Sequence, residues 1–506
     1  MNGRRMKPWI AAAAVGYVLL LCLLVWAESR GEGALIDSFP KALWYSLVTV
    51  TTVGYGDLYP VTLPGRLIGL VFLLLSTGLL ALLVGFIFSA FTGRLFPRFR
   101  LWRRRRDKWY VFCPDNEASR ALAAALTDGL TVFCGAASAP AGSAVSLDMS
   151  PEALFELPYA ADGERCFFAM DDAVSSNDAL AAALRERDVR IYCRSDGPDE
   201  GLPANVTTFG DAECAARLYW QSQPWSSTGE RAALIGNGRY ARALLLQGLL
   251  TAPPDCEIDV FGDWSAWLGI HGDLSGVPDA QFCLRFHPEG WQACPDTLKA
   301  ADRVVLCADD AGTNREALFL LRRYYVLRGS LHARCPEGLQ PAWYFGDAQS
   351  VFTPELVMKR ALDARARQLH ALYRAGADYP VPPWDALPDF LKRSNLAAAD
   401  HLLTKLRLLL PEEDVREITP DACRRAADRY DAADAAFKER CRIIEHARWC
   451  LFHALYNWRY APVRDNAERL HPMLVTYDKL DEVERAKDDN AWLLLRQLSG
   501  TPEKRG

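Results

Sequence analysis

The sequence lacks the residue patterns that usually mark a disulfide framework, a metal centre or a nucleic-acid-binding surface. Its 14 cysteines are scattered, with no Cys-x-x-Cys pair and no group of histidines and cysteines at zinc spacing. Positive charge is not in excess, because the formal net charge is -5 at pH 7. We therefore expect reduced thiols in a cytosolic environment, no metal held by cysteine or histidine, and no nucleic-acid partner.

Long uncharged stretches are also absent from most of the chain, and they occur only before residue 100. The remainder is mixed, charged sequence of the globular type. At 506 residues the chain is too long for one hydrophobic core and suggests about three or four folded units. Any membrane part is therefore confined to the N-terminal region.

Two uncharged stretches, residues 8–27 and 67–93, are each long enough to cross a bilayer as a helix. Basic residues precede the first stretch and follow the second, including the run 103–106, whereas Glu28, Glu32, Asp37 and Asp57 lie between the stretches. Because basic flanks stay in the cytoplasm, we expect a multi-pass protein of the cell inner (plasma) membrane with both termini cytoplasmic. A cleaved signal peptide is the alternative for the first stretch, but the segment that follows it requires a helix before it.

A short apolar and aromatic segment, residues 40–50, lies between these stretches and is too short to cross the bilayer. It predicts a re-entrant helix, and it leads into the sequence Thr52, Val53, Gly54, Tyr55, Gly56 and Asp57. Non-helical backbone at membrane depth is tolerated only where it is buried in protein or lines a water-filled path. A ring of four such segments would meet that condition.

The residue types in this segment suit the binding of potassium ions. Backbone carbonyls of Thr52, Val53, Gly54 and Tyr55, with the Thr52 hydroxyl, can replace the hydration shell of the ion. Glycine at positions 54 and 56 can take positive φ at little steric cost, which keeps the carbonyls pointed inward. Tyr55 is expected to pack outward on Trp44 and Tyr45 and to brace the diameter of the filter.

In this context the sequence resembles the two-transmembrane potassium channels of bacteria, and the resemblance extends through residues 57–67. It implies a homotetrameric pore, surrounded by membrane lipid, without a charged voltage-sensor helix. The sequence departs from the family at Val48, where some members carry a carboxylate. The family's hinge glycine aligns with Ser76, so we expect bending near Ser76 and Gly78, with helix packing as the alternative role of these small residues.

From residue 108 onward, short β-rich runs alternate with helices rich in alanine and leucine, which is typical of a parallel α/β domain. The pattern occurs twice, and each pass ends on Asp-Asp followed by a polar segment with Asn177 or Asn314. This internal similarity predicts two Rossmann-like lobes, lobe one over residues 108–228 and lobe two over residues 229–350.

Two such lobes after a channel pore resemble the domains that regulate potassium conductance, which assemble as a ring beneath the membrane. A dinucleotide site in this fold needs glycines that let backbone N–H groups approach phosphate. Residues 113–118 of lobe one, which occupy the position of this motif, contain no glycine. We therefore expect lobe one to have a structural role and not to bind a dinucleotide. Lobe two keeps Gly236, Asn237 and Gly238, with Asp263 near the usual ribose-binding position, so either a nucleotide site or a packing turn is expected there.

Calcium-gated relatives require carboxylates that converge on one point. The candidates here are Asp171, Asp172, Asp196, Asp211 and Glu213. Arg194 intrudes beside Asp196, and aspartates are common at strand ends. A calcium site is therefore a weaker alternative than a nucleotide site.

The C-terminal region, after a proline-rich linker, resembles the ryanodine-receptor repeat. The resemblance depends on the ordered motifs Glu-His-Ala-Arg-Trp (445–449), Asn-Trp-Arg-Tyr (457–460), Arg-Asp (464–465) and His-Pro (471–472). Trp449, Trp458, Tyr460 and Arg464 could stack on and clamp a purine nucleotide. The alternative is that the two tryptophans form a small core while Arg464 pairs with Asp465.

Together these features predict a potassium channel gated by a cytosolic small molecule, with a nucleotide as the possible ligand, and not an enzyme. The alternatives are a membrane-tethered nucleotide sensor with a non-conducting pore, and a dinucleotide oxidoreductase, for which no catalytic group of residues is evident. The expected domains are the pore (1–94), a basic connector (95–107), lobe one (108–228), lobe two (229–350), a helix and linker (351–383) and a mainly α-helical repeat domain (384–498).

Overall fold

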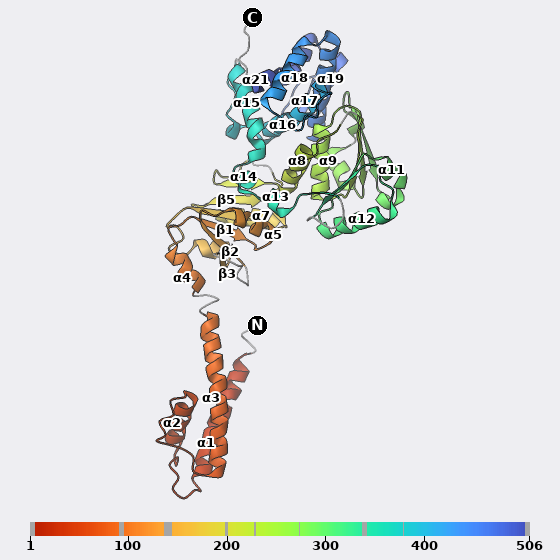
Figure 1. Ribbon diagram of the computed structural model, residues 1–506. Coiled ribbons are helices and arrows are strands. Elements are labelled where there is room, and N and C mark those ends of the chain that lie inside the picture. The colour runs from red at the N-terminus through yellow and green to blue at the C-terminus, as the bar shows by residue number, and fades with distance from the viewer. Residues whose placement is uncertain are drawn as a thin grey trace. The chain divides into compact units, whose positions relative to one another are not determined.

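A computed structural model of the protein describes residues 6–90, 96–135, 144–197, 201–226, 229–272, 274–335, 342–377 and 379–500. The chain divides into two compact units (Figure 1). The first unit contains Met1–Arg104 and Val145–Asp148, and the second contains Arg105–Ala144 and Met149–Gly506. Each unit is described by itself below.

The first unit is helical. Its helices are α1 (Met6–Glu28), α2 (Phe39–Val50), α3 (Leu63–Ala90) and α4 (Phe96–Arg103). These bounds agree with the helices expected over 8–27, 40–50 and most of 67–93, while residues 91–93 lie outside the described part. Among the described residues, however, no helix is both long enough and apolar enough to span a membrane. The prediction of two spanning helices is therefore not confirmed.

A small core and one buried carboxylate hold these helices together. Leu21 and Leu24 of α1 pack with Ala42 of α2 and Phe72 of α3. Glu28, at the end of α1, is fully buried and accepts hydrogen bonds from the backbone N–H groups of Val61 and Thr62 at 2.9 and 3.0 Å and from the Thr62 hydroxyl at 2.7 Å. A buried carboxylate needs such donors, so Glu28 fixes the chain just before α3.

Lobe one contains a six-stranded sheet in the order β3-β2-β1-β4-β5-β6. The strands are β1 (Trp109–Cys113), β2 (Leu130–Cys134), β3 (Val145–Leu147), β4 (Arg165–Ala169), β5 (Arg190–Arg194) and β6 (Val206–Phe209). The pairs β1-β2, β1-β4, β4-β5 and β5-β6 are parallel. The helices are α5 (Glu117–Ala125), α6 (Pro151–Phe155), α7 (Val174–Leu184) and α8 (Asp211–Ser222).

Lobe two repeats this topology. Its strands are β7 (Arg231–Ile235), β8 (Cys256–Phe261), β9 (Phe282–His287), β10 (Arg303–Leu306), β11 (Ser330–Arg334) and β12 (Trp343–Phe345). They form a parallel sheet in the order β12-β11-β10-β7-β8-β9, the same arrangement as in lobe one. The helices are α9 (Arg239–Thr251), α10 (Ser265–His271), α11 (Pro295–Ala300) and α12 (Ala311–Tyr324). The prediction of two Rossmann-like parallel α/β lobes is confirmed.

The two asparagines noted in the sequence occupy equivalent positions. Asn177 is fully buried, and its side chain bonds to both the N–H and the C=O of Asp171 and to the C=O of Arg194. Asn314 is also buried and makes the same three bonds with Ala308 and Arg334. Each amide thus satisfies otherwise orphaned backbone groups at the ends of two adjacent strands, which explains why both lobes need it.

After lobe two the chain returns to lobe one before it enters the C-terminal helices. Helices α13 (Ala348–Val351) and α14 (Pro354–Val357) place Val351, Phe352 and Val357 in the core of lobe one. Helix α15 (Ala364–Gly376), which we had placed with the linker, contributes Leu369 to the C-terminal core instead. Its amphipathic face can be buried only against helices that follow it.

The C-terminal region is mainly helical, as expected. It contains α16 (Asp389–Asp400), α17 (Leu402–Leu409), α18 (Pro420–Ala432), α19 (Ala435–Leu455), α20 (Glu482–Lys487), α21 (Asn490–Leu498) and the short parallel pair β13 (Arg459–Tyr460) and β14 (Leu470–His471). It is not an independent helical domain, because Leu451 and Phe452 of α19 share one hydrophobic core with Leu244 and Leu245 of lobe two.

Candidate functional site

The predicted filter segment directly follows α2. Its backbone has positive φ at every second residue, 60° at Thr52, 58° at Gly54 and 73° at Gly56. When left-handed and right-handed backbone conformations alternate, successive carbonyl groups point to the same side of the chain. A row of cation-binding positions requires this arrangement. Positive φ at the two glycines was expected. Positive φ at Thr52, where an L side chain makes it costly, was not.

One aromatic side chain braces this segment. Trp44 of α2 stacks on Tyr55, with the rings 6.1 Å apart and 2° from parallel, and its Nε1–H donates to Asp57 Oδ2 at 2.8 Å. The expected contact of Tyr55 with Trp44 is therefore present. Tyr45, the second expected partner, instead meets Phe72 of α3 edge-on at 6.5 Å. Successive residues of a helix point in different directions, so Trp44 and Tyr45 cannot both face the filter.

The proposed hinge residues Ser76 and Gly78 both lie within α3. A Cβ added at Gly78 would meet no atom of the chain within 4 Å. Packing within the chain therefore gives no reason for glycine at this position, and the hinge stays a prediction.

The phosphate turn of lobe one is closed by its own side chains. Asn116 accepts from the Ser119 N–H at 2.8 Å and donates to the Met170 carbonyl at 2.8 Å. Asp115 pairs with Arg120 at 2.7 Å. The start of α5 is thus capped internally, which agrees with a structural lobe.

The equivalent turn of lobe two is occupied by a carboxylate. Asp309 accepts hydrogen bonds from the backbone N–H groups of Arg239 and Tyr240 at 3.0 and 3.1 Å, at the start of α9. A Cβ added at Gly238 would lie 2.4 Å from this carboxylate. Asp309 therefore sits where a bound phosphate would sit, and Gly238 makes room for it. This geometry favours the packing-turn alternative for Gly236, Asn237 and Gly238.

Asp263 has a local role as well. Its Oδ1 accepts from the Ser265 N–H at 2.9 Å, and its backbone carbonyl accepts from Asn237 Nδ2 at 3.1 Å. The carboxylate thus closes the turn before α10. Its contacts are those of a turn residue rather than of a ribose-binding acid.

Four of the calcium candidates are bound by arginines, Glu213 by Arg393 of α16. The other three share two arginines: Asp211, which is fully buried, accepts from Arg194, Arg239 and the Tyr240 hydroxyl, while Asp172 pairs with Arg194 and Asp196 with Arg239. Burial alone would raise the pKa of Asp211, but its bonds to Arg194 and the nearby charges hold that pKa well below its usual range. These groups form an ion-pair network between the two lobes. A calcium ion would have to displace guanidinium groups to reach them.

The C-terminal ligand candidates do not form one site. Trp458 is only 8% exposed and stacks on Phe390 with ring centroids 5.0 Å apart, while Trp449 packs on His453 at 3.9 Å. Tyr460 is 57% exposed, and Arg464 donates to Asn466 at 2.8 Å. The tryptophans therefore act as core residues, as the alternative predicted. The predicted pairing of Arg464 with Asp465 is replaced by its bond to Asn466.

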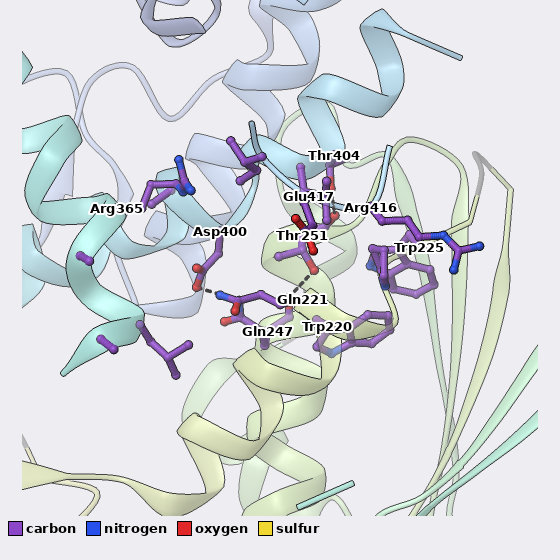
Figure 2. Close-up of a pocket in the computed structure, with 17 residues that line it drawn as sticks. Trp220, Gln221, Trp225, Gln247, Thr251, Arg365, Asp400, Thr404, Arg416 and Glu417 are labelled. Carbon is purple, nitrogen blue, oxygen red and sulfur yellow. Dashed lines mark hydrogen bonds between the residues drawn. The ribbon is translucent and has the colours of Figure 1, made fainter. Parts of the chain in front are cut away.

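A cavity of about 410 Å³ lies between the end of α8, helix α9 of lobe two and the C-terminal helices. Figure 2 shows Trp220 and Trp225 on the right, Arg365 and Asp400 on the left and Thr404 above them. The two indole rings stack at 4.5 Å, and Gln247 donates to Asp400 at 2.9 Å. Sequence reasoning missed this site, because its walls come from segments far apart in the chain. The three aromatic residues between positions 219 and 225 were one available signal.

A second cavity, of about 440 Å³, adjoins the first and shares Gln247 and Asp400 with it. Most of its charged lining is paired, since Arg393 bonds to Glu213 at 3.0 Å, Arg217 to Asp400 at 2.8 Å and Arg239 to Asp196 at 2.7 Å. The first cavity is therefore the better candidate for a ligand.

Comparison with known proteins finds a channel domain at the N-terminus. A family model described as an ion channel matches residues 9–93. Potassium voltage-gated channel subfamily A member 6 of Homo sapiens is 42% identical over 55 residues, which are 11% of this chain and 10% of that protein. Potassium voltage-gated channel protein Shal of Drosophila melanogaster is 35% identical over 83 residues, 16% of this chain and 14% of that protein. The chain thus spans between a tenth and a seventh of the length of these relatives.

Two solved structures are similar over more of the chain. The crystal structure of the GsuK bound to ADP is 17% identical with a TM-score of 0.32, and covers 81% of this chain and 100% of that one. The GsuK channel bound to NAD is 14% identical with a TM-score of 0.29, and covers 81% and 85%. These scores are too low to support an inference. The family match does not reach beyond residue 93, so the predicted conductance-regulating ring and ryanodine-receptor repeat stay predictions.

Proposed function

We propose that this chain is the pore-forming subunit of a potassium-selective membrane channel whose opening is controlled by its cytosolic α/β lobes. The observation that carries the proposal is the filter backbone, with positive φ at Thr52, Gly54 and Gly56 and with Trp44 bound to both Tyr55 and Asp57. The match of residues 9–93 to an ion-channel model supports it.

The surface of the first unit supports a membrane location. Large apolar side chains of α1 and α3 are widely exposed, among them Val15 at 60%, Leu74 at 67% and Phe88 at 69%. A soluble monomer rarely exposes so many large apolar groups on adjacent helices. We therefore propose that lipid and neighbouring copies of the chain cover them, with four chains completing the filter and both termini on the cytoplasmic side.

The test is ion flux in liposomes that contain the purified chain. Potassium and rubidium are expected to pass far faster than sodium, because the carbonyl spacing replaces the hydration shell of the larger ions. Equal sodium flux would contradict the proposal. Absence of any flux, with a nucleotide still bound, would instead support the alternative of a membrane-tethered sensor with a non-conducting pore.

Ligand control is the second part of the proposal, and the 410 Å³ cavity is the proposed ligand site. Its volume lies within the range of small-molecule sites. Stacked Trp220 and Trp225 offer a flat apolar wall, and Arg365 offers a positive charge. Because its walls come from α8 of lobe one, from α9 of lobe two and from the C-terminal helices, an occupant would favour one arrangement of these parts. A nucleotide, which has a flat base and a negative charge, fits these features.

Substituting Arg365→Ala is expected to remove the stabilisation that a nucleotide gives to the full chain. A ligand at 100 times its Kd stabilises a protein by about 2.7 kcal/mol. We therefore expect one of ATP, ADP or NAD to raise the melting temperature of the wild-type chain by several degrees. Arg367→Ala is the matched control, because Arg367 lies on the same helix, pairs with Asp385 and is not in the cavity lining. A shift kept in Arg365→Ala but lost in Arg464→Ala would move the site to the C-terminal aromatic residues.

A further inference from the structure

Three side chains able to bind a metal ion meet at one edge of the lobe-two sheet. His287 ends the edge strand β9, Glu289 follows two residues later, and Cys294 directly precedes α11. In the part of the chain that the structure describes, no other trio of histidine, cysteine or carboxylate residues has its ligand atoms this close together. The cluster has no residue in common with the cavity of Figure 2.

The distances within the cluster match those between ligands of a tetrahedral ion. Cys294 Sγ lies 3.2 Å from Glu289 Oε1 and 3.8 Å from His287 Nδ1, and Nδ1 lies 3.3 Å from Oε1. Zinc bonds of about 2.0–2.3 Å at tetrahedral angles place two ligand atoms about 3.3–3.8 Å apart. An ion can therefore enter between the three atoms with shifts of a few tenths of an ångström.

A buried carboxylate orients the histidine for this role. Asp259 on the neighbouring strand β8 is fully buried, and its Oδ1 lies 2.7 Å from His287 Nε2. In the tautomer whose Nε2–H donates to Asp259, the Nδ1 lone pair faces Glu289 and Cys294. A carboxylate behind a ligating histidine is the usual arrangement in metal sites. Phe261 stacks on the imidazole at 4.7 Å and restricts its rotation further.

The loop that carries the other two ligands is shaped by the backbone. Gly290 has a φ of 86°, and its N–H bonds to the His287 carbonyl at 3.2 Å, so the chain turns back immediately after Glu289. Trp291 is then buried in the core of lobe two, which holds Cys294 near the end of β9. The sequence spacing His-x-Glu-x4-Cys therefore closes into one site.

We propose that His287, Glu289 and Cys294 bind a zinc ion through Nδ1, one carboxylate oxygen and the thiolate. Imidazole with thiolate is a donor set that favours zinc over calcium or magnesium. The Glu289 side chain is 49% exposed, so the fourth position of the ion faces solvent and takes a water molecule. On binding, the Cys294 thiol, which donates to Glu289 in the metal-free protein, releases its proton to solvent.

The test is metal binding by the full chain purified in detergent and stripped with a chelator. Wild-type protein is expected to take up one more zinc ion per chain than Cys294→Ser. Its cobalt-substituted form is expected to show a thiolate-to-cobalt charge-transfer absorption that the variant lacks. Glu289→Gln alters an exposed side chain without threatening the fold, and it should weaken zinc binding by at least about tenfold.

Cys283→Ser is the matched control, because Cys283 is also on β9, is exposed and lies outside the cluster. It should bind zinc and show the absorption like the wild type. Equal zinc content and equal absorption in Cys294→Ser and wild type would overturn the proposal, as would unchanged zinc affinity in Glu289→Gln. The readout does not involve ion flux, so its outcome is independent of the proposed channel function.

Discussion

Replacing Gly54 by alanine is expected to abolish potassium flux through the channel that we propose. Gly54 has a φ of 58°, and a Cβ there would meet no atom of the chain within 4 Å, so the penalty comes from the backbone conformation and not from a clash. Left-handed backbone costs an L-residue about 1–2 kcal/mol. In a ring of four chains the strain would be repeated four times, on the order of 4–8 kcal/mol.

The filter can relieve this strain by turning a carbonyl away from the ion path. Since 1.36 kcal/mol corresponds to a tenfold change in rate, a potassium flux at least about 1,000-fold lower is expected. Gly16→Ala is the control, because Gly16 lies within α1 and an added Cβ there also meets open space. Flux through Gly54→Ala within about tenfold of the wild type, measured in the same liposomes, would contradict the assigned filter.

The second large effect is expected at Arg217, whose guanidinium ties lobe one to the C-terminal helices. Its side chain is buried, and it donates to Asp400 at 2.8 Å, to Asp363 at 2.9 Å and to the Leu362 carbonyl at 2.8 Å. Arg217→Ala would leave the Asp400 carboxylate without its cation and would leave Asp363 with Arg360 alone. Removing one partner of a buried ion pair costs about 3–5 kcal/mol, so the melting temperature of the second unit should fall by several degrees.

A second substitution separates this electrostatic effect from lost packing. Asp400→Asn keeps a hydrogen-bond acceptor for Gln247 but removes the carboxylate charge that Arg217→Ala leaves without a cation. Adding Asp400→Asn to Arg217→Ala should therefore restore part of the lost stability. Lys359→Ala is the surface control, because Lys359 and its partner Glu355 are 71% and 59% exposed. An exposed pair contributes about 0–1 kcal/mol. If the Arg217 and Lys359 variants had the same melting temperature, the ion pairs of Arg217 would not be what holds lobe one to the C-terminal helices.

Much of the fold could be predicted from the sequence because the signals are local. The α/β pattern predicted from residue 108 onward begins with strand β1 (Trp109–Cys113), since a buried parallel strand is a short apolar run that ends at a turn residue. The filter could be predicted for the same reason. Its positive φ values at Gly54 and Gly56 follow from the glycines themselves, and α2 follows from the apolar run before it.

The parts that the sequence did not reveal depend on side chains that are distant along the chain. Gly236 and Gly238 signalled a phosphate turn, but Asp309, some seventy residues later, fills that turn with a carboxylate. The motif could not show this, because an aspartate after a strand has many possible partners. From the sequence, Glu28 counted only as one of the acidic residues between the two uncharged stretches. In the structure it is buried and accepts hydrogen bonds from the backbone of the segment before α3.

The sequence predicted no metal site held by cysteine or histidine, because that prediction depended on spacing alone. Spacing recognises only ligands that are close together in one regular motif. His287 and Cys294 come together because the chain turns at Gly290. Asp259, which orients the His287 ring, comes from a neighbouring strand. Helices, strands, the internal repeat and the positive φ of the predicted filter segment could thus be inferred from the sequence, because they follow from periodicity and from backbone freedom within a few residues. Which carboxylates are free for a ligand could be learned only from the folded chain, since burial and pairing depend on which elements pack together.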